Sequence, residues 1–373
     1  MKNTYRILLA LGIIIGIFVY TQQNPQDTSP FKVGVSVPLT GDAASLGEFF
    51  KNISDMAVEK INSEGGVNGR KISLIYEDDS CAPAKAVSVI RKLISVEKVK
   101  TIVISTCSGA VVPTVPVATE NGVFLFSGIA TSPTLTDISP MFARTVPSDT
   151  SQGTALANYS ISKGFKKIAI IHEMTDYPVS IKDAFASVYT TDNGMLLTEG
   201  FAADKSDFRS ILAKVKVENP DAVFFIPGSP AVADRLISSF GTLDWKVPLM
   251  GGDIFSGGSE VVIKHKNTVE GMAIAEQKAG PDTAEYVAFK NEYKQRFGKD
   301  LIYESRAQAQ YDLFFILRDG FKKYGDNPVE LAKWVRTVKN YPGFAGGITI
   351  GENGDAVGGH AVKVIKDGKV EEI

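Results

Sequence analysis

Three turns rich in glycine, serine and threonine hold the residue types best suited to binding a small charged ligand. Residues 105–110 follow a predicted strand and open a predicted helix, residues 127–132 follow the next strand, and residues 250–253 follow a later strand. Free backbone N–H groups and a serine hydroxyl can bind an anion, whereas the Asp253 carboxylate can bind a cation. Each turn alone is explained by helix capping. Together, at the carboxyl ends of parallel strands, they predict a site for a zwitterion, with Asp253 at the edge of a cleft.

Residue sets that would support catalysis or metal binding are missing. The histidines His172, His265 and His360 have no neighbours at metal-ligand spacing, so we expect no metal site. No P-loop lysine motif, no GxGxxG after the first strand and no GxSxG elbow occurs. The acidic run 77–79 is typical of a solvated sheet edge, and residues 352–355 of a hairpin turn. We therefore expect a binding protein that has no cofactor and is not an enzyme.

The hydrophobic pattern predicts two α/β blocks that lie end to end. The first block has predicted strands at 31–37, 71–76, 101–105 and 123–126, alternating with helices at 46–61, 87–94 and 110–120. The second has strands at 167–172, 222–226 and 247–250, with helices from 179, at 208–215 and at 231–240. This alternation favours parallel sheets flanked by helices. Helices at 286–297 and 308–323 have no strand between them, and short strands at 347–350 and 361–365 follow, so we expect the chain to cross between lobes more than once.

The composition agrees with a folded protein of two domains. The 373 residues are 44% hydrophobic and 22% charged, and the formal net charge is −2. No basic excess points to nucleic acid, so we expect no nucleic-acid partner.

The N-terminal 30 residues have the layout of an export signal. Lys2 and Arg6 precede an apolar run at 7–20, and a polar linker follows. No small-x-small cleavage site follows the run, so a cleaved signal and an uncleaved membrane anchor both remain open. Either one places the rest of the chain outside the cytoplasm.

The chain has two cysteines, Cys81 and Cys107, and each follows a predicted strand. In an exported protein this number suggests one disulfide, the alternative being two free buried thiols.

The stretches KVGVSVPLTGD, CSGAVVPTVPVATENGVFLFSGIATSPTLT, VPLMGGD and ITIGENGDAVGGHAVKVIKDGKV carry a family resemblance. Over nearly all of residues 31–373 the chain resembles the periplasmic leucine/isoleucine/valine-binding family, the type I solute-binding proteins of ABC importers. The resemblance implies lobe I at 31–148 plus 277–351 and lobe II at 149–276 plus 352–373, with three crossovers between two parallel sheets. It also implies a ligand held in the cleft by hinge closure, and an ABC permease as partner.

The resemblance also implies roles for particular residues. The turn with Ser108 and Gly109, together with Thr131, holds the ligand carboxylate. A backbone carbonyl near Ile129 or Ala130, and the Asp253 carboxylate, hold the ammonium. The side chain of Tyr177 covers the ligand, and Cys81 and Cys107 match a pair of bonded cysteines.

The chain departs from the family pattern at the side-chain end of the pocket. Gly228 and Ser229 stand where branched-chain binders have a tyrosine, Leu46 replaces an aromatic residue, and Asp253 replaces a glutamate. We expect an amino acid ligand. A receptor for an amide, urea or aromatic acid and a sensory ligand-binding ectodomain remain the alternatives.

Overall fold

The computed structural model describes residues 28–256 and 258–373. The predicted signal or anchor at 7–20 lies outside these residues, so both N-terminal alternatives stay predictions. Within the described part of the chain, no helix combines the length and apolar character needed to cross a membrane.

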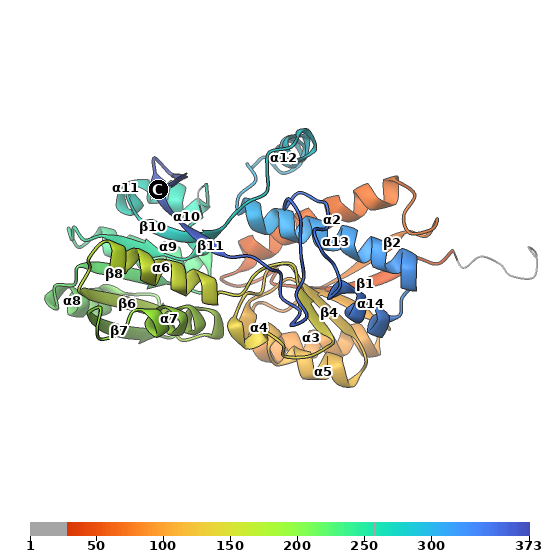
Figure 1. Cartoon of the computed structure of the whole chain (residues 1–373), viewed down its shortest axis with the longest axis horizontal. Coiled ribbons are helices and arrows are strands. Elements are labelled where there is room, and N and C mark those ends of the chain that lie inside the picture. Colours follow the sequence, from red (N-terminus) through yellow and green to blue (C-terminus); the bar gives the residue numbers. More distant parts are fainter. Residues whose placement is uncertain (1–27, 257) are drawn as a thin grey trace, which may run out of the picture.

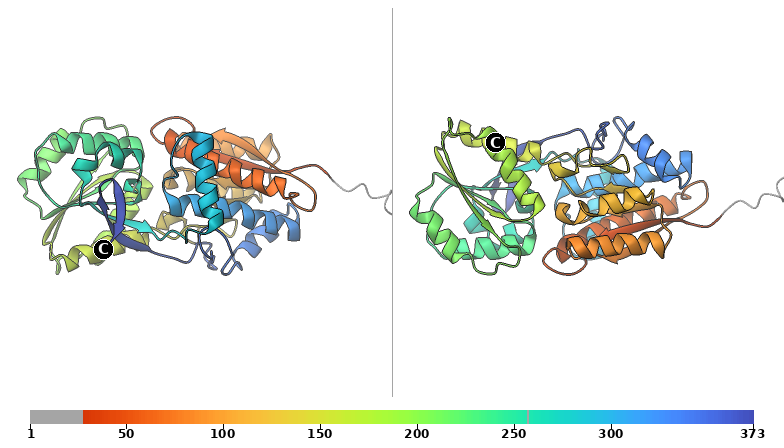
Figure 2. Two further views of the ribbon diagram at one scale, coloured as in Figure 1. Left: turned by 90° about the horizontal axis from the view of Figure 1, so that it is seen from above. Right: turned by 90° about the horizontal axis from the view of Figure 1, so that it is seen from below.

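The described chain forms two lobes side by side, each built on one sheet (Figures 1 and 2). The first sheet has five parallel strands in the order β2-β1-β3-β4-β5. Strands β3 and β4 are buried along their whole length, as parallel strands covered on both faces require. The elements are β1 (Phe31–Val37), α2 (Ala44–Ser63), β2 (Ile72–Asp78), α3 (Pro83–Ser95), β3 (Thr101–Ile104), α4 (Ser108–Val111), α5 (Thr114–Glu120), β4 (Phe124–Ser127), the 3-10 turn η1 (Pro133–Leu135) and β5 (Phe142–Arg144).

The second sheet has seven strands in the order β12-β11-β10-β9-β8-β6-β7, of which β11 and β12 run antiparallel to their neighbours. Its elements are α6 (Thr150–Ser162), β6 (Lys167–Glu173), α7 (Asp176–Val188), β7 (Met195–Phe201), α8 (Arg209–Val217), β8 (Ala222–Ile226), α9 (Pro230–Gly241), β9 (Leu249–Gly251), η2 (Asp253–Phe255), α10 (Glu260–Lys264), α11 (Lys266–Val269), β10 (Ala273–Gln277), β11 (His360–Lys366) and β12 (Lys369–Glu372).

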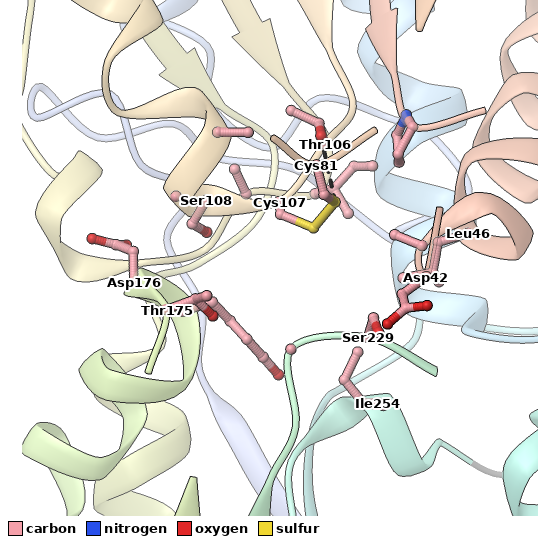
Figure 3. Close-up of a pocket in the computed structure, with 18 of the residues that line it drawn as sticks. Asp42, Leu46, Cys81, Thr106, Cys107, Ser108, Thr175, Asp176, Ser229 and Ile254 are labelled. Carbon is pink, nitrogen blue, oxygen red and sulfur yellow. Dashed lines mark hydrogen bonds between the residues drawn. A yellow bond between two sulfur atoms is a disulfide. The ribbon is translucent and has the colours of Figure 1, made fainter. Parts of the chain in front are cut away.

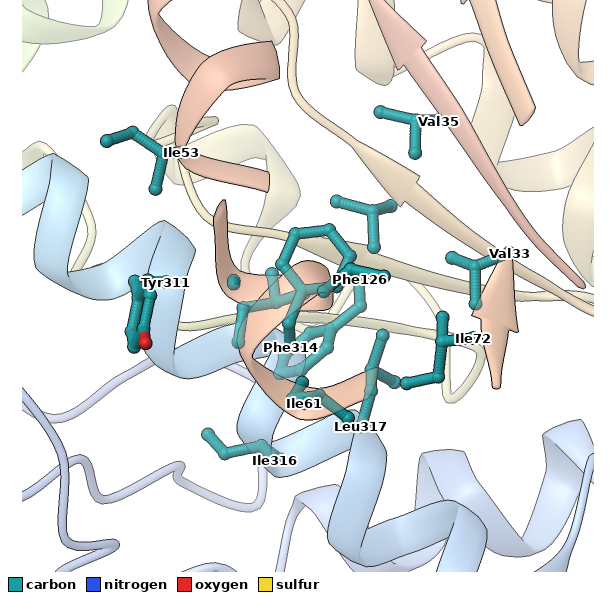
Figure 4. Close-up of a cluster of buried hydrophobic side chains, with 14 of the residues drawn as sticks. Val33, Val35, Ile53, Ile61, Ile72, Phe126, Tyr311, Phe314, Ile316 and Leu317 are labelled. Atoms are coloured by element: carbon teal, nitrogen blue, oxygen red, sulfur yellow. The ribbon is translucent and has the colours of Figure 1, made fainter. Parts of the chain in front are cut away.

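Three late helices return to the first lobe: α12 (Ala284–Phe297), α13 (Glu304–Tyr324) and α14 (Pro328–Val335). Helix α13 lies against α2, and its Phe314 and Leu317 side chains join the buried cluster that contains Val33 and Phe126 (Figure 4). The chain therefore crosses between the lobes at residues 145–149, at 278–283 and before β11. The predicted fold class is confirmed, with its parallel-dominated sheets and three crossovers; the lobe boundaries stay a prediction.

Three local expectations were wrong. The single helix expected at 110–120 is split into α4 and α5 at Pro113, because proline has no N–H to donate to the preceding turn. The segment 347–350 forms only isolated bridges rather than a strand. The acidic run is not a solvated edge: the fully buried Asp79 carboxylate accepts hydrogen bonds from Ser36 Oγ at 2.6 Å and Thr106 Oγ1 at 2.7 Å.

The predicted disulfide is confirmed between Cys81 and Cys107, whose Cα atoms are 5.3 Å apart. Cys81 follows β2 and Cys107 follows β3, and both strands pair with β1. Because the carboxyl ends of these parallel strands meet at one edge, residues 26 positions apart in sequence become neighbours.

We expect the double variant Cys81→Ser/Cys107→Ser to lose about 3 kcal/mol of unfolding free energy, because the disulfide restricts the unfolded chain. Urea unfolding checks this, with reduced wild-type protein as the matched control. Two alkylatable thiols in protein from an oxidising compartment would contradict the assignment.

Candidate functional site

A cavity of about 520 Å³ lies between the two lobes and is lined by residues of both (Figure 3). Figure 3 shows Ser108 and Asp176 towards one side of it and Asp42, Leu46 and Ser229 towards the other. The structure brings all nine predicted ligand-binding residues to this one cavity, although their contacts with a ligand stay predictions. They are Leu46, Ser108, Gly109, Ile129, Ala130, Thr131, Tyr177, Ser229 and Asp253.

The two turns predicted to hold an anion are joined by the Ser108 hydroxyl. Ser108 begins α4, after β3, and its Oγ accepts hydrogen bonds from the backbone N–H groups of Thr131 and Ser132, each at 3.2 Å. Thr131 follows β4, the neighbouring strand. Because the Ser108 oxygen is an acceptor in both bonds, its own proton is available for a ligand carboxylate.

Arg306, near the start of α13, contacts Asp253 and the Ile129 carbonyl, one of the two carbonyls that the family resemblance offers for the ligand's ammonium. Its Nε donates to Asp253 Oδ2 at 3.0 Å, its Nη2 donates to the same oxygen, and its Nη1 donates to the Ile129 carbonyl at 3.2 Å. The Tyr177 hydroxyl donates to Asp253 Oδ1 at 2.7 Å. Asp253 lines the cavity and is one half of a buried ion pair between the lobes, a partner that the sequence does not predict; its contact with a ligand stays a prediction.

Both members of this pair are charged. Burial is the largest single influence and acts to raise the pKa of Asp253, but the charge of Arg306 and the hydrogen bonds from Tyr177 and Arg306 together hold the pKa below its usual value. Burial acts to lower the pKa of Arg306, but the charges of Asp253 and Asp149 raise it overall. Burial and the charge of Asp253 hold the Tyr177 pKa well above its usual value, so its hydroxyl remains a donor. The pair as a whole contributes no net charge to the cleft.

Two further titratable groups lie near the pair, where the chain crosses between the lobes. Asp149 is fully buried before α6, and burial together with the charge of Asp253 raises its pKa to about 7. Burial, and secondarily the charge of Arg306, lowers the pKa of His360 to about 4. The His360 ring is therefore neutral near pH 7, with its Nδ1 2.7 Å from Ser151 Oγ. No group of metal-ligating side chains large enough to hold an ion occurs among the described residues.

The departures from the family pattern at Gly228 and Ser229 have a structural explanation. The buried Glu173 carboxylate, at the end of β6, accepts hydrogen bonds from the Gly228 N–H at 2.8 Å and Thr175 Oγ1 at 3.0 Å. A Cβ atom at position 228 would lie 2.5 Å from Glu173 Oε1, so a larger residue there would require this carboxylate to shift. Ser229 caps α9, since its Oγ accepts the Val232 N–H at 3.3 Å. Neither the sequence motifs nor the resemblance predicts Glu173 as a lining residue.

Other polar contacts also cross the cleft. Arg235 of α9 pairs with Asp42 of the first lobe at 2.7 Å, and Thr134 Oγ1 donates to the Asp176 carboxylate of α7 at 3.2 Å. Together with the Asp253–Arg306 pair, they hold the two lobes against each other around the cavity.

Comparison with known proteins shows the family of this chain. Residues 30–369 match the model of the family described as periplasmic binding protein. The chain belongs to this family. Its members are solute-binding proteins rather than enzymes, and the family implies a location outside the cytoplasm.

Two curated relatives show how far the likeness extends. An "Amino acid binding protein" of Pseudomonas aeruginosa is 32% identical over 197 residues, 52% of this chain and 52% of that protein. The match therefore spans about half of that relative's length. The "Leu/Ile/Val-binding protein" of Escherichia coli K12 is 25% identical over 355 residues, 93% of this chain and 94% of the relative.

Solved structures of the same fold hold different ligands. The branched-chain amino acid binding protein LivJ of Streptococcus pneumoniae, in complex with isoleucine, has a TM-score of 0.81 and 26% identity, covering 92% of this chain and 98% of that one. A solute-binding protein of Rhodopseudomonas palustris BisB5, in complex with 3,4-dihydroxybenzoic acid, has a TM-score of 0.80 and 23% identity, covering 92% and 95%. The second likeness shows the fold alone.

We expect Asp149→Asn to change how stability depends on pH. The folded-state pKa of about 7 lies above the ordinary carboxyl value of about 3.9. Protonated Asp149 therefore stabilises the fold fully below about pH 4, and this contribution is lost as the pH rises through about 7. Asparagine keeps the shape of the side chain without its charge. The change in unfolding free energy caused by Asp149→Asn should therefore be more favourable at pH 8 than at pH 4.5, by about 2–4 kcal/mol.

Urea unfolding at pH 4.5 and pH 8 measures this difference, with the surface variant Asp192→Asn as control. Parallel pH dependence of wild type and Asp149→Asn would contradict it.

Proposed function

We propose that this solute-binding protein captures a small organic carboxylate between its lobes and delivers it to an ABC permease. The observation that carries the proposal is the joined pair of turns at Ser108 and Thr131, which face a cavity enclosed by both lobes. The Ser108 proton and the Thr131 hydroxyl are donors suited to a carboxylate. In this proposal the apolar segment 7–20 is either an export signal that is cleaved or an anchor that holds the protein at the membrane.

Closure of the two lobes around the ligand follows from the position of the donors in the first lobe and of the opposite cavity wall in the second. A carboxylate bound at Ser108 in the first lobe places the rest of the ligand against Tyr177 and Ile254 of the second lobe. Only the closed arrangement makes both sets of contacts, so the ligand favours that arrangement by its differential affinity.

Two ligand classes are candidates for the group next to the carboxylate. The relatives that bind amino acids by name favour an amino acid, whose ammonium would be held by Asp253 and the Ile129 carbonyl. The second candidate, a carboxylic acid without an amine, is favoured by the contacts of Arg306 with the same two acceptors. A sensory ectodomain with the same ligand would use the same cleft and differ only in its partner.

We expect Ser108→Ala to weaken carboxylate binding by about 10- to 100-fold, because a hydrogen bond to a charged group contributes about 1.5–3 kcal/mol. A thermal-shift screen of amino acids, 2-oxo acids and aromatic acids finds the ligand, since binding raises apparent stability by mass action. Calorimetry on wild type and variant then measures the loss.

Ser108→Ala also leaves the N–H groups of Thr131 and Ser132 without their acceptor. Unfolding of the ligand-free variant separates this structural cost from the loss of affinity, and the exposed α3 variant Ser88→Ala is the control. Unchanged affinity in a folded Ser108→Ala protein would contradict the proposed site.

A further inference from the structure

The guanidinium of Arg306 occupies the place that the resemblance assigns to the ammonium of an amino acid. It bonds the Ile129 carbonyl of the first lobe and Asp253 Oδ2 of the second, while Tyr177 bonds Asp253 Oδ1. The acceptors that an α-ammonium group would need are thus already bound by donors of the protein itself.

A second cation at this point would be repelled. An α-ammonium group close enough to bond Asp253 or the Ile129 carbonyl would lie beside the guanidinium of the buried Arg306, which is held by three hydrogen bonds. Like charges repel strongly in a closed cleft from which water is excluded. The acidic groups nearby do not offset this, because Asp253 is already paired with Arg306 and the fully buried Asp149 does not line the cavity.

Arg306 also changes the kind of hydrogen bond that this part of the cavity offers. Of the five N–H donors of an arginine, three are used here, and one remains on each of Nη1 and Nη2. Arg306 lines the cavity, so the remaining donors serve an oxygen acceptor better than another donor.

We infer that Arg306 is a specificity-determining residue, and that the ligand is a carboxylic acid with no α-ammonium group. A 2-oxo acid, a 2-hydroxy acid and an aromatic acid share this chemistry: a carboxylate for Ser108 and Thr131, and an oxygen acceptor or no polar group beside Arg306. This inference rests on the proposed function and narrows its ligand class.

Calorimetry on the full chain tests this with matched pairs that differ only in the α-substituent. The pairs are alanine and pyruvate, leucine and 4-methyl-2-oxopentanoate, and phenylalanine and phenylpyruvate, with benzoate as the aromatic acid. We expect at least one acid without an amine to bind, and at least tenfold tighter than its amino partner where it has one. An amino acid that binds more tightly than its 2-oxo partner overturns the inference while leaving the proposed function intact.

Two variants assign the selectivity to Arg306. Arg306→Gln removes the charge and frees the Asp253 carboxylate, so the ratio of 2-oxo to amino acid affinity should fall at least tenfold. Arg306→Lys keeps the charge, so the preference for the acid without an amine should persist. An unchanged ratio in Arg306→Gln, with the fold verified by circular dichroism, overturns the role of Arg306.

If a variant does not fold, the wild-type pairs decide the ligand class by themselves. Failure of every carboxylate to bind the wild-type protein overturns the proposed function, and this inference with it.

Discussion

The buried ion pair between Arg306 and Asp253 is the interaction on which the closed arrangement of the two lobes depends. Arg306 stands on α13 in the first lobe, and Asp253 follows β9 in the second. Neither charge can be left alone in a protein interior without a large desolvation cost, so each fixes the position of the other. The pair also fixes the Tyr177 hydroxyl and the Ile129 carbonyl, and thereby shapes the centre of the cavity.

The other contacts across the cleft are of a different kind. The Asp42 and Arg235 side chains are 49% and 28% exposed, and exposed ion pairs of this type contribute roughly 0–1 kcal/mol. Opening the cleft can exchange them for water at little cost. In contrast, an opening motion that separates Arg306 from Asp253 requires water to enter the cleft and hydrate both charges. The ligand therefore acts on an equilibrium between two states that the protein's own charges already define.

Most of the fold was predictable because its signals are local. Strands buried on both faces leave unbroken apolar runs, helices leave apolar residues at intervals of three and four, and the alternation of the two predicts parallel sheets. The predicted turns converge for the same reason, since the carboxyl ends of parallel strands meet at one edge. The failures were also local in cause: Pro113 divides a helix that the apolar pattern alone makes continuous, and residues 347–350 lack a neighbouring strand to pair with.

The ion pair was not predictable in this way, because Asp253 and Arg306 are 53 positions apart and meet only when the lobes come together.

The sequence of α13 does carry a partial signal. Arg306, Gln308, Gln310 and Asp312 alternate along this helix, and a step of two residues turns a helix by about 200°. Such residues cannot all share one solvent-facing side, so a helix that carries them must bury some of its polar groups. All four are buried, and each has a specific partner: Arg306 bonds Asp253, Gln308 bonds Gly280, Gln310 bonds Ser54 and Ser105, and Asp312 bonds Phe344 and Ala345. Polar residues spread around a predicted helix therefore indicate that several elements of the fold meet on it, although they do not reveal which elements those are.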